Sequence, residues 1–276
     1  MPLKLMYITN IPDVAHIAES SGVDRIFVDM EYIGKAARQG GMDTVQNHHT
    51  IEDVHRIRQT LTKAELMVRV NPIHEALPDY PSSEEEIGAA IDAGADVIML
   101  PYFKMAREVQ KAIDIIDGRA RFMPLLETPE AVDALDEILA LRGIDELHIG
   151  INDLSLGYGK KFMFEMLSDG TVERICLKCR LAGIPYGFGG VAGIGSGKLP
   201  AEVVLREHYR LGSSFVILSR SFCNVTERSD LTCVREQFES GVRGIRAFEQ
   251  EIERYTSYFQ DNQQTLIKTV AEIVGS

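Results

Sequence analysis

Long apolar runs and a surplus of basic residues are both missing from this sequence of 276 residues. No run approaches the roughly 20 apolar residues of a membrane-spanning helix, and the start, MPLKLMYITN, lacks the successive charged and apolar regions of a signal peptide. Lysine and arginine number 29 against 41 aspartates and glutamates, a formal charge of −12. Because nucleic acid and anionic lipid are bound by basic surfaces, we expect neither as a partner, and we expect a cytoplasmic protein without membrane contact.

Cysteine is scarce as well, with four residues in the chain. Cys176 and Cys179 have the C-x-x-C spacing of some metal and redox sites. On the helix predicted over residues 171–183, however, positions i and i+3 share one face, and no second pair follows at the spacing of a zinc ribbon. We therefore interpret the cysteines as core residues.

Eight short apolar or β-branched segments recur along the chain, and amphipathic segments lie between them. The intervening segments have apolar residues at intervals of three and four and begin with Thr, Ser or Pro, which is typical of helices. Continuous apolar strands are typical of a parallel sheet buried on both faces. The sequence thus predicts a (β/α)8 TIM barrel, with a doubly wound sheet as the alternative. The eight predicted strands are residues 4–9, 25–30, 65–71, 97–103, 121–127, 146–152, 185–190 and 215–220.

Nothing in the sequence resembles an interdomain linker, so we expect residues 1–276 to form a single barrel domain. Residues 225–276 are predicted to be a C-terminal helical extension. The part over 225–259 carries more apolar positions than a solvated tail needs. We therefore expect the extension to take part in oligomerisation.

Polar residues at the ends of the predicted strands indicate where a site could form, because the active sites of such barrels lie at the C-terminal ends of the strands. Asp29 ends the second strand, Arg69 lies in the third, Glu127 ends the fifth, and Asp153 follows the sixth. Two carboxylates at adjacent strand ends, with no Cys or His in phase, suit a hard divalent cation held by oxygen. The alternative is structural: Asp153 caps a turn and Glu127 pairs with Arg69.

Four segments, VDMEY, MVRVNP, LLETPEAV and IGINDLSLGYG, together resemble the metal-dependent HpcH/HpaI aldolases, relatives of the citrate lyase β-subunit in the phosphoenolpyruvate/pyruvate barrel superfamily. The resemblance spans roughly residues 10 to 222. It implies that Glu127 and Asp153 bind Mg²⁺, Mn²⁺ or Co²⁺, which chelates pyruvate, and that Arg69 stabilises the enolate. It also implies that the backbone N–H groups after the IG of IGINDLSLGYG hold the pyruvate carboxylate, which makes Gly150 and Asn152 candidate substrate-binding residues.

The chain departs from this family where the family has Asp-x-Glu-His, because it has Asp29 and Glu31 followed by a tyrosine, Tyr32. Asp29 stays a candidate catalytic residue. A longer loop follows, and either of its histidines, His48 or His49, could serve as the base. Alternatively the loop binds substrate while a metal-bound water transfers the proton. Either way the loop also offers Arg38 to a substrate anion.

Two further groups of residues complete the expected site. Asp92 matches an acidic residue that family members contribute to a neighbouring subunit, which implies a homo-oligomer, a hexamer or another assembly based on trimers or dimers; a surface helix end is the alternative. The glycine-rich stretch 187–197, with Gly189 and Gly190, could bind an anion. Together with Arg220 it favours a phosphorylated or sugar-like aldehyde, against the alternative of a surface lid.

We therefore predict an enzyme, a class II pyruvate aldolase that uses a divalent metal to cleave or form a 4-hydroxy-2-oxo acid through the enolate of pyruvate. Its small-molecule partners would be pyruvate or another 2-oxo acid and an aldehyde. Three alternatives stay open: a CoA-ester lyase like citrate lyase, an enzyme that uses phosphoenolpyruvate, and a barrel that binds keto acids without catalysis.

Overall fold

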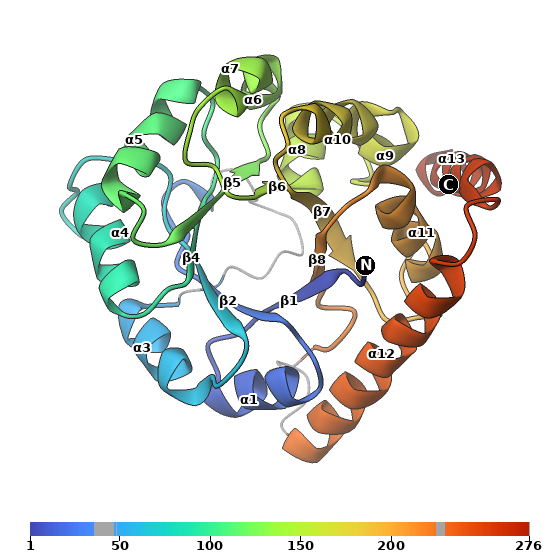
Figure 1. Ribbon diagram of the computed structural model, residues 1–276, viewed down its shortest axis with the longest axis horizontal. Coiled ribbons are helices and arrows are strands. Elements are labelled where there is room, and N and C mark those ends of the chain that lie inside the picture. The colour runs from blue at the N-terminus through green and yellow to red at the C-terminus, as the bar shows by residue number, and fades with distance from the viewer. Residues whose placement is uncertain (36–46, 48, 225–229, 276) are drawn as a thin grey trace.

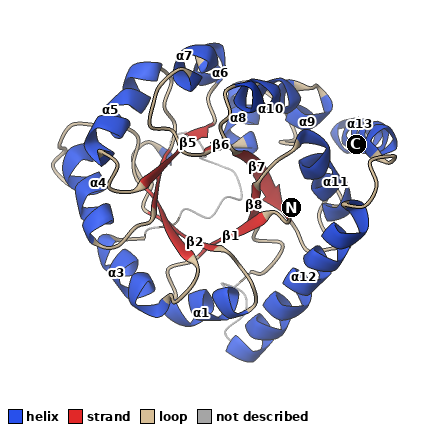
Figure 2. Ribbon diagram, in the orientation of Figure 1, coloured by secondary structure: helices blue, strands red, loops and turns tan. Residues whose placement is uncertain are grey.

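Eight parallel strands close into a barrel in the order in which they occur in the chain, β1 to β8. A computed structural model describes residues 1–35, 47, 49–224 and 230–275. Figure 1 looks into the barrel, and Figure 2 shows the strands enclosed by a ring of helices. Each predicted strand segment overlaps one strand, so the (β/α)8 barrel is confirmed and the doubly wound alternative is wrong. The strands are β1 (Lys4–Ile8), β2 (Arg25–Asp29), β3 (Glu65–Arg69), β4 (Val97–Leu100), β5 (Arg121–Leu126), β6 (Leu147–Ile149), β7 (Tyr186–Val191) and β8 (Phe215–Leu218).

The helices return the chain from the end of one strand to the start of the next. Several begin where the sequence predicts a cap: the hydroxyls of Thr50, Ser82 and Thr128 each accept a backbone N–H of the first turn that follows. The segment 128–141 forms two short helices instead of one, because the backbone of Ala134, at ψ 7°, leaves the helical region. The helices are α1 (Pro12–Ser20), α3 (Ile51–Thr60), α4 (Ser83–Asp92), α5 (Ala106–Ile116), α6 (Pro129–Asp133), α7 (Leu135–Leu139), α8 (Ile151–Gly157), α9 (Glu165–Ser168), α10 (Thr171–Leu181), α11 (Ala201–Leu211), α12 (Leu231–Ile252) and α13 (Phe259–Gly275).

Side chains alternate between the two faces of each strand, and the apolar residues therefore form two layers. One layer lies between the strands and the helices, and a smaller cluster fills the inside of the barrel. Because both faces of every strand are covered, the strands read as continuous apolar runs. The smaller cluster consists of Met6, Phe27, Met67, Val97, Met99, Met123, Leu125 and Phe215, with Ile8 and Ile217 packed against it. Cys176 and Cys179 are buried in the outer layer.

The two C-terminal helices, α12 and α13, pack against the barrel of their own chain. In Figure 1, α12 lies beside α1 and α11, and α13 lies outside α11. The side-chain amide of Asn262 on α13 donates to Glu207 on α11 at 2.8 Å. Among the described helices, none is long and apolar enough to cross a membrane. The buried apolar residues of α12 are Val234, Phe238, Val242, Ile245 and Ile252.

The apolar positions that suggested oligomerisation are therefore covered within one chain. Their number no longer argues for a partner subunit, because burial on the chain's own barrel explains it. Oligomerisation itself stays a prediction.

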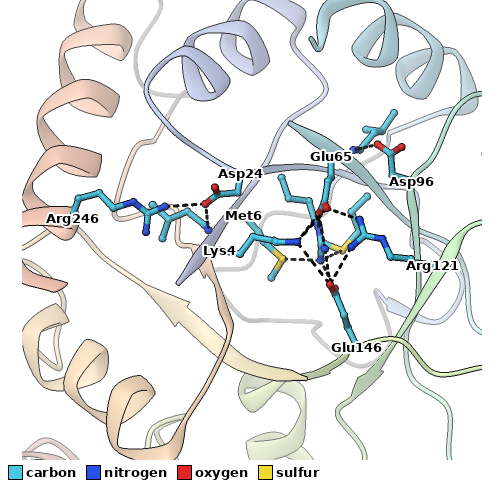
Figure 3. Close-up of polar contacts among 12 residues, drawn as sticks. Lys4, Met6, Asp24, Glu65, Asp96, Arg121, Glu146 and Arg246 are labelled. Carbon is cyan, nitrogen blue, oxygen red and sulfur yellow. Dashed lines mark hydrogen bonds and ion pairs between the residues drawn. The ribbon is translucent and has the colours of Figure 1, made fainter. Parts of the chain in front are cut away.

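A network of ion pairs closes the barrel at the N-terminal ends of its strands. The fully buried Arg25 lies 2.7 Å from a carboxylate oxygen of Glu65 and 2.7 Å from one of Glu146. Lys4 and Arg121 pair with the same two glutamates, and Figure 3 shows these side chains converging. Burial raises the pKa of Glu65, but the charges of Arg25 and Lys4 outweigh burial and lower that pKa to about 2. Glu65 is therefore ionised at neutral pH and remains paired with its cations.

Replacement of Arg25 by methionine should strongly destabilise the fold, because it leaves two carboxylates near the barrel axis without their buried counter-charge. The expected loss is about 3–5 kcal/mol in the free energy of unfolding, measured by urea denaturation. Lys268→Met is the control, since Lys268 pairs with Glu272 at 4.0 Å on the surface, and it should change stability by less than about 0.5 kcal/mol. If the two variants were equally stable, Arg25 and its ion pairs would not contribute to the free energy of unfolding.

Candidate active site

A cavity of about 470 Å³ opens at the C-terminal ends of the strands. Asp92 does not reach it: it is exposed at the end of α4, next to the start of β4, at the opposite end of the barrel. Arg38 and His48 lie outside the described residues. The cavity brings together the other predicted site residues, which are Asp29, His49, Arg69, Glu127, Gly150, Asn152, Asp153, Gly189, Gly190 and Arg220.

The most strongly bonded pair in this cavity is Asp29 and Arg69. The two residues are register partners on β2 and β3. Arg69 donates through Nε to one carboxylate oxygen of Asp29 at 2.8 Å and through Nη2 to the other at 2.7 Å. Burial raises the pKa of Asp29, but Arg69 and Lys35 outweigh it and hold that pKa well below its usual range. Asp29 is thus a permanent anion that orients Arg69 through a bidentate contact.

Lys35, which the sequence analysis did not single out, belongs to the same cluster. Its side chain is 5% exposed, and its ammonium lies 2.8 Å from Asp29 and 3.5 Å from Glu31. Glu31 also lies 3.3 Å from Nε of Arg69. Two buried carboxylates therefore face two buried cations beside the cavity. The lysine follows β2 in a segment without periodicity, so no pattern in the sequence distinguishes it from a solvated side chain.

Tyr32, which replaces the histidine of the Asp-x-Glu-His pattern, points elsewhere. Its ring stacks on Tyr80 with 5.8 Å between centroids, and the residue is 40% exposed. Its backbone N–H donates to the side chain of Asn71 at 2.8 Å. Tyr32 is not among the described residues that line the cavity.

Glu127 and Asp153 supply two carboxylates from neighbouring strand ends. One oxygen of Glu127 accepts the backbone N–H of Tyr102 at 3.0 Å. Asp153 lies in the first turn of α8, and the side-chain amide of Asn152 donates to it at 3.1 Å. A Cβ atom on Gly150 would lie 2.8 Å from the other oxygen of Glu127, so only glycine leaves room for the carboxylate there.

This donor set fits a hard divalent cation. Within the described ranges no three His, Cys, Asp or Glu side chains are grouped as ligands. A site of two carboxylates suits a metal such as Mg²⁺, which keeps water or substrate oxygens in its other positions. Gly150 leaves room for the carboxylate of Glu127 at this position, which is consistent with a metal-ligand role for Glu127.

Two histidines of the described part of the chain line the cavity, and both have a lowered pKa that leaves them neutral at pH 7. Asp29 donates its backbone N–H to Nδ1 of His49 at 3.0 Å, and burial lowers the pKa of His49. His148 lies inside the barrel on β6, where burial lowers its pKa to about 3. Its Nε2 lies 3.2 Å from the carbonyl oxygen of Gly189. The sequence analysis did not single out His148, although its position between the outward-facing Leu147 and Ile149 could have indicated it.

One known protein family and several solved structures are similar to this chain. Residues 5–192 match the family described as HpcH/HpaI aldolase/citrate lyase. A solved HpcH/HpaI aldolase/citrate lyase family protein from Burkholderia cenocepacia J2315 is 18% identical, with 85% of this chain and 95% of that chain covered and a TM-score of 0.63. An HpcH/HpaI aldolase from Desulfitobacterium hafniense DCB-2 is 16% identical over 88% and 93% of the two chains, with a TM-score of 0.59.

A third similar structure is the citrate synthase SbnG, 16% identical over 86% of this chain and 94% of that chain, with a TM-score of 0.60. At these identities the likeness to solved structures shows the fold alone. No curated protein sequence matches the chain.

Gly150→Ala should weaken metal binding, because the added methyl group displaces the carboxylate of Glu127. We expect the affinity for Mn²⁺, measured by calorimetric titration, to fall by roughly 10–100-fold, the usual effect of disturbing a residue that supports a ligand. Gly193→Ala is the matched control, since a Cβ on Gly193, in the glycine-rich stretch beside the cavity, meets nothing within 4 Å. Unchanged affinity in Gly150→Ala would argue against Glu127 as a ligand.

Proposed function

The chain belongs to the HpcH/HpaI aldolase/citrate lyase family, and from this premise we propose that it is a metal-dependent carbon–carbon lyase acting on 4-hydroxy-2-oxo acids. The reaction would pass through the enolate of pyruvate. The observation that carries the proposal is that the carboxylates of Glu127 and Asp153 line one cavity with the guanidinium of Arg69.

Glu127 and Asp153 would hold the divalent cation, Mg²⁺, Mn²⁺ or Co²⁺. When bound, the cation supplies Lewis-acid polarisation of the keto oxygen. Among the described residues, three carboxylates and three cations line the cavity, so their formal charges cancel. A divalent cation would therefore make the cavity positive, which favours an anionic substrate such as a 2-oxo acid.

Arg69 would stabilise the negative charge that develops on the enolate oxygen. Asp29 engages Nε and one N–H of Nη2, so Nη1 and the second N–H of Nη2 are left to meet a substrate. The guanidinium is already oriented before substrate arrives, and a preorganised donor costs no rearrangement during the reaction. The role of Asp29 is then to position Arg69.

The remaining predicted residues would bind the two ends of the substrate. The backbone N–H of Asn152, in the first turn of α8, would hold the carboxylate of pyruvate, because N–H groups in the first turn of a helix have no partner within it. The N–H of Gly150 is not available for this role, since it donates to the carbonyl oxygen of Leu126 at 2.9 Å. Gly189 and Gly190 on β7 and Arg220 after β8 would meet a polar or phosphorylated aldehyde. These residues line the same cavity as Arg69 and Asp29.

Proton exchange tests this function directly. With Mn²⁺ or Mg²⁺ in D₂O, the protein should exchange deuterium into the methyl group of pyruvate, followed by NMR. Glu127→Ala and Asp153→Ala should each lose this exchange together with Mn²⁺ affinity, because each removes a proposed ligand. Glu130→Ala, which removes a surface carboxylate paired with Lys104, is the control and should exchange normally. Metal-dependent binding of pyruvate without exchange would instead indicate a keto-acid-binding barrel without catalysis.

We also propose that the protein is a homo-oligomer in which Asp92 serves the site of a neighbouring copy, since Asp92 is exposed and far from the cavity of its own chain. Light scattering should give a multiple of the 30.8 kDa chain mass. Asp92→Ala and Glu127→Ala should each be inactive alone, whereas mixed oligomers of the two should regain activity, because some sites then combine intact residues. A monomer, or a mixture that stays inactive, would contradict a shared site.

A further inference from the structure

His49 is placed to donate a hydrogen bond and not to remove a proton. We propose that its neutral imidazole donates through Nε2 to the oxygen of the aldehyde as the carbon–carbon bond forms or breaks. This inference rests on the proposed lyase function, and it assigns the histidine a role different from that of a base.

The position of the ring proton follows from the bond between Asp29 and His49. A backbone N–H can only donate, so Nδ1 of His49, 3.0 Å from the nitrogen of Asp29, must be an acceptor without a proton. Turning the ring over would put a carbon in that place and lose the bond. A neutral imidazole with a bare Nδ1 carries its proton on Nε2. That atom is the only polar atom left on the ring, and the residue lines the cavity.

His49 is held by a contact of its ring on one side and by the start of a helix at the next residue on the other, so its position is part of the fold. Asp29 ends β2, where its side chain binds Arg69. On the other side, Thr50 caps α3, and its backbone N–H donates to Asp53 at 2.9 Å. His49 is thus fixed between the end of a barrel strand and the start of a helix.

The charges around the ring keep it neutral. Burial lowers the pKa of His49, Lys35 and Arg69 lower it further, and the opposing effects of Asp29 and Asp53 do not make up the difference. For Nε2 to accept a proton, Nδ1 would have to be protonated and would then face the N–H of Asp29. Base catalysis by His49 would therefore require breaking the bond that positions it.

The chemistry of the reaction offers this donor one oxygen. When the enolate of pyruvate adds to an aldehyde, negative charge moves between two oxygens: the enolate oxygen gives it up and becomes a keto oxygen, and the aldehyde oxygen gains it and becomes an alkoxide. Arg69 and the proposed metal face the first, which leaves the second for a donor elsewhere in the cavity. A neutral imidazole with its N–H toward substrate can polarise such a carbonyl. The hydrogen bond transfers no proton, so the base that acts on the 4-hydroxyl group must be a different group.

Two conservative variants separate a donor from a base. Gln has an amide N–H₂ near the position of Nε2, whereas the shorter Asn can replace only Nδ1. For a donor, His49→Gln should keep kcat for aldol cleavage within roughly tenfold, and His49→Asn should lose roughly 10²–10³-fold. For a base, both variants should fall alike, by roughly 10²–10⁴-fold, and the acid limb of the pH profile of kcat/KM should disappear, because neither amide takes up a proton. Equal losses would overturn the proposal.

A second measurement does not depend on activity. Nitrogen-15 NMR of the metal-loaded protein at pH 7 should show the ring proton of His49 on Nε2 and a bare Nδ1. A proton on Nδ1, or on both nitrogens, would overturn the inference even if the protein is an active lyase. Conversely, an Nε2 proton in a protein that exchanges no deuterium into pyruvate would uphold the tautomer and refute the lyase function, and with it the donor role.

Discussion

The buried ion pair of Asp29 and Arg69 is the interaction on which the candidate site depends. Moving an aspartate and an arginine out of water costs several kcal/mol per ion, which is recovered only when the pair is well aligned and its remaining atoms are bonded. Both conditions hold here: the contact is bidentate, and Lys35 and Asn47 donate to the same carboxylate at 2.8 and 3.0 Å. Through the backbone of Asp29 this pair also sets the ring of His49. One residue at the end of β2 therefore orients a guanidinium, an ammonium and an imidazole.

The two ends of the barrel have different roles: one contributes to stability, and the other carries the candidate site. At the N-terminal ends of the strands, the buried Arg25 pairs with the buried Glu146 and the half-buried Glu65, and these ion pairs hold strands together. At the C-terminal ends, the charges line an open cavity of about 470 Å³. The apolar cluster inside the barrel lies between the two networks and keeps the strand ends at fixed spacing. This division agrees with the general tendency of such barrels to carry function at one face only.

Much of the fold and part of the site could be predicted from the sequence. The strands were evident because burial on both faces makes them continuous apolar runs, and Glu127 and Asp153 stood out as carboxylates at the ends of such runs. Lys35 did not, because its burial depends on pairing with Asp29, a contact that no local pattern encodes. The sequence indicates that α12 has an apolar face but not which surface covers it, because the pattern of a helix shows which face is buried and not what packs against that face. The proton on His49 depends on one backbone contact across 20 residues and needs coordinates to be seen.

The central claim is that Glu127 and Asp153 together hold a divalent cation next to Arg69. Anomalous diffraction from crystals grown with Mn²⁺ and pyruvate tests it most directly, because the signal locates the metal independently of activity. The account predicts one strong manganese peak within bonding distance of a carboxylate oxygen of Glu127 and one of Asp153, with pyruvate between the metal and Arg69. A peak bound by Asp29 and Glu31 instead, or pyruvate bound with no manganese in the cavity, would contradict it.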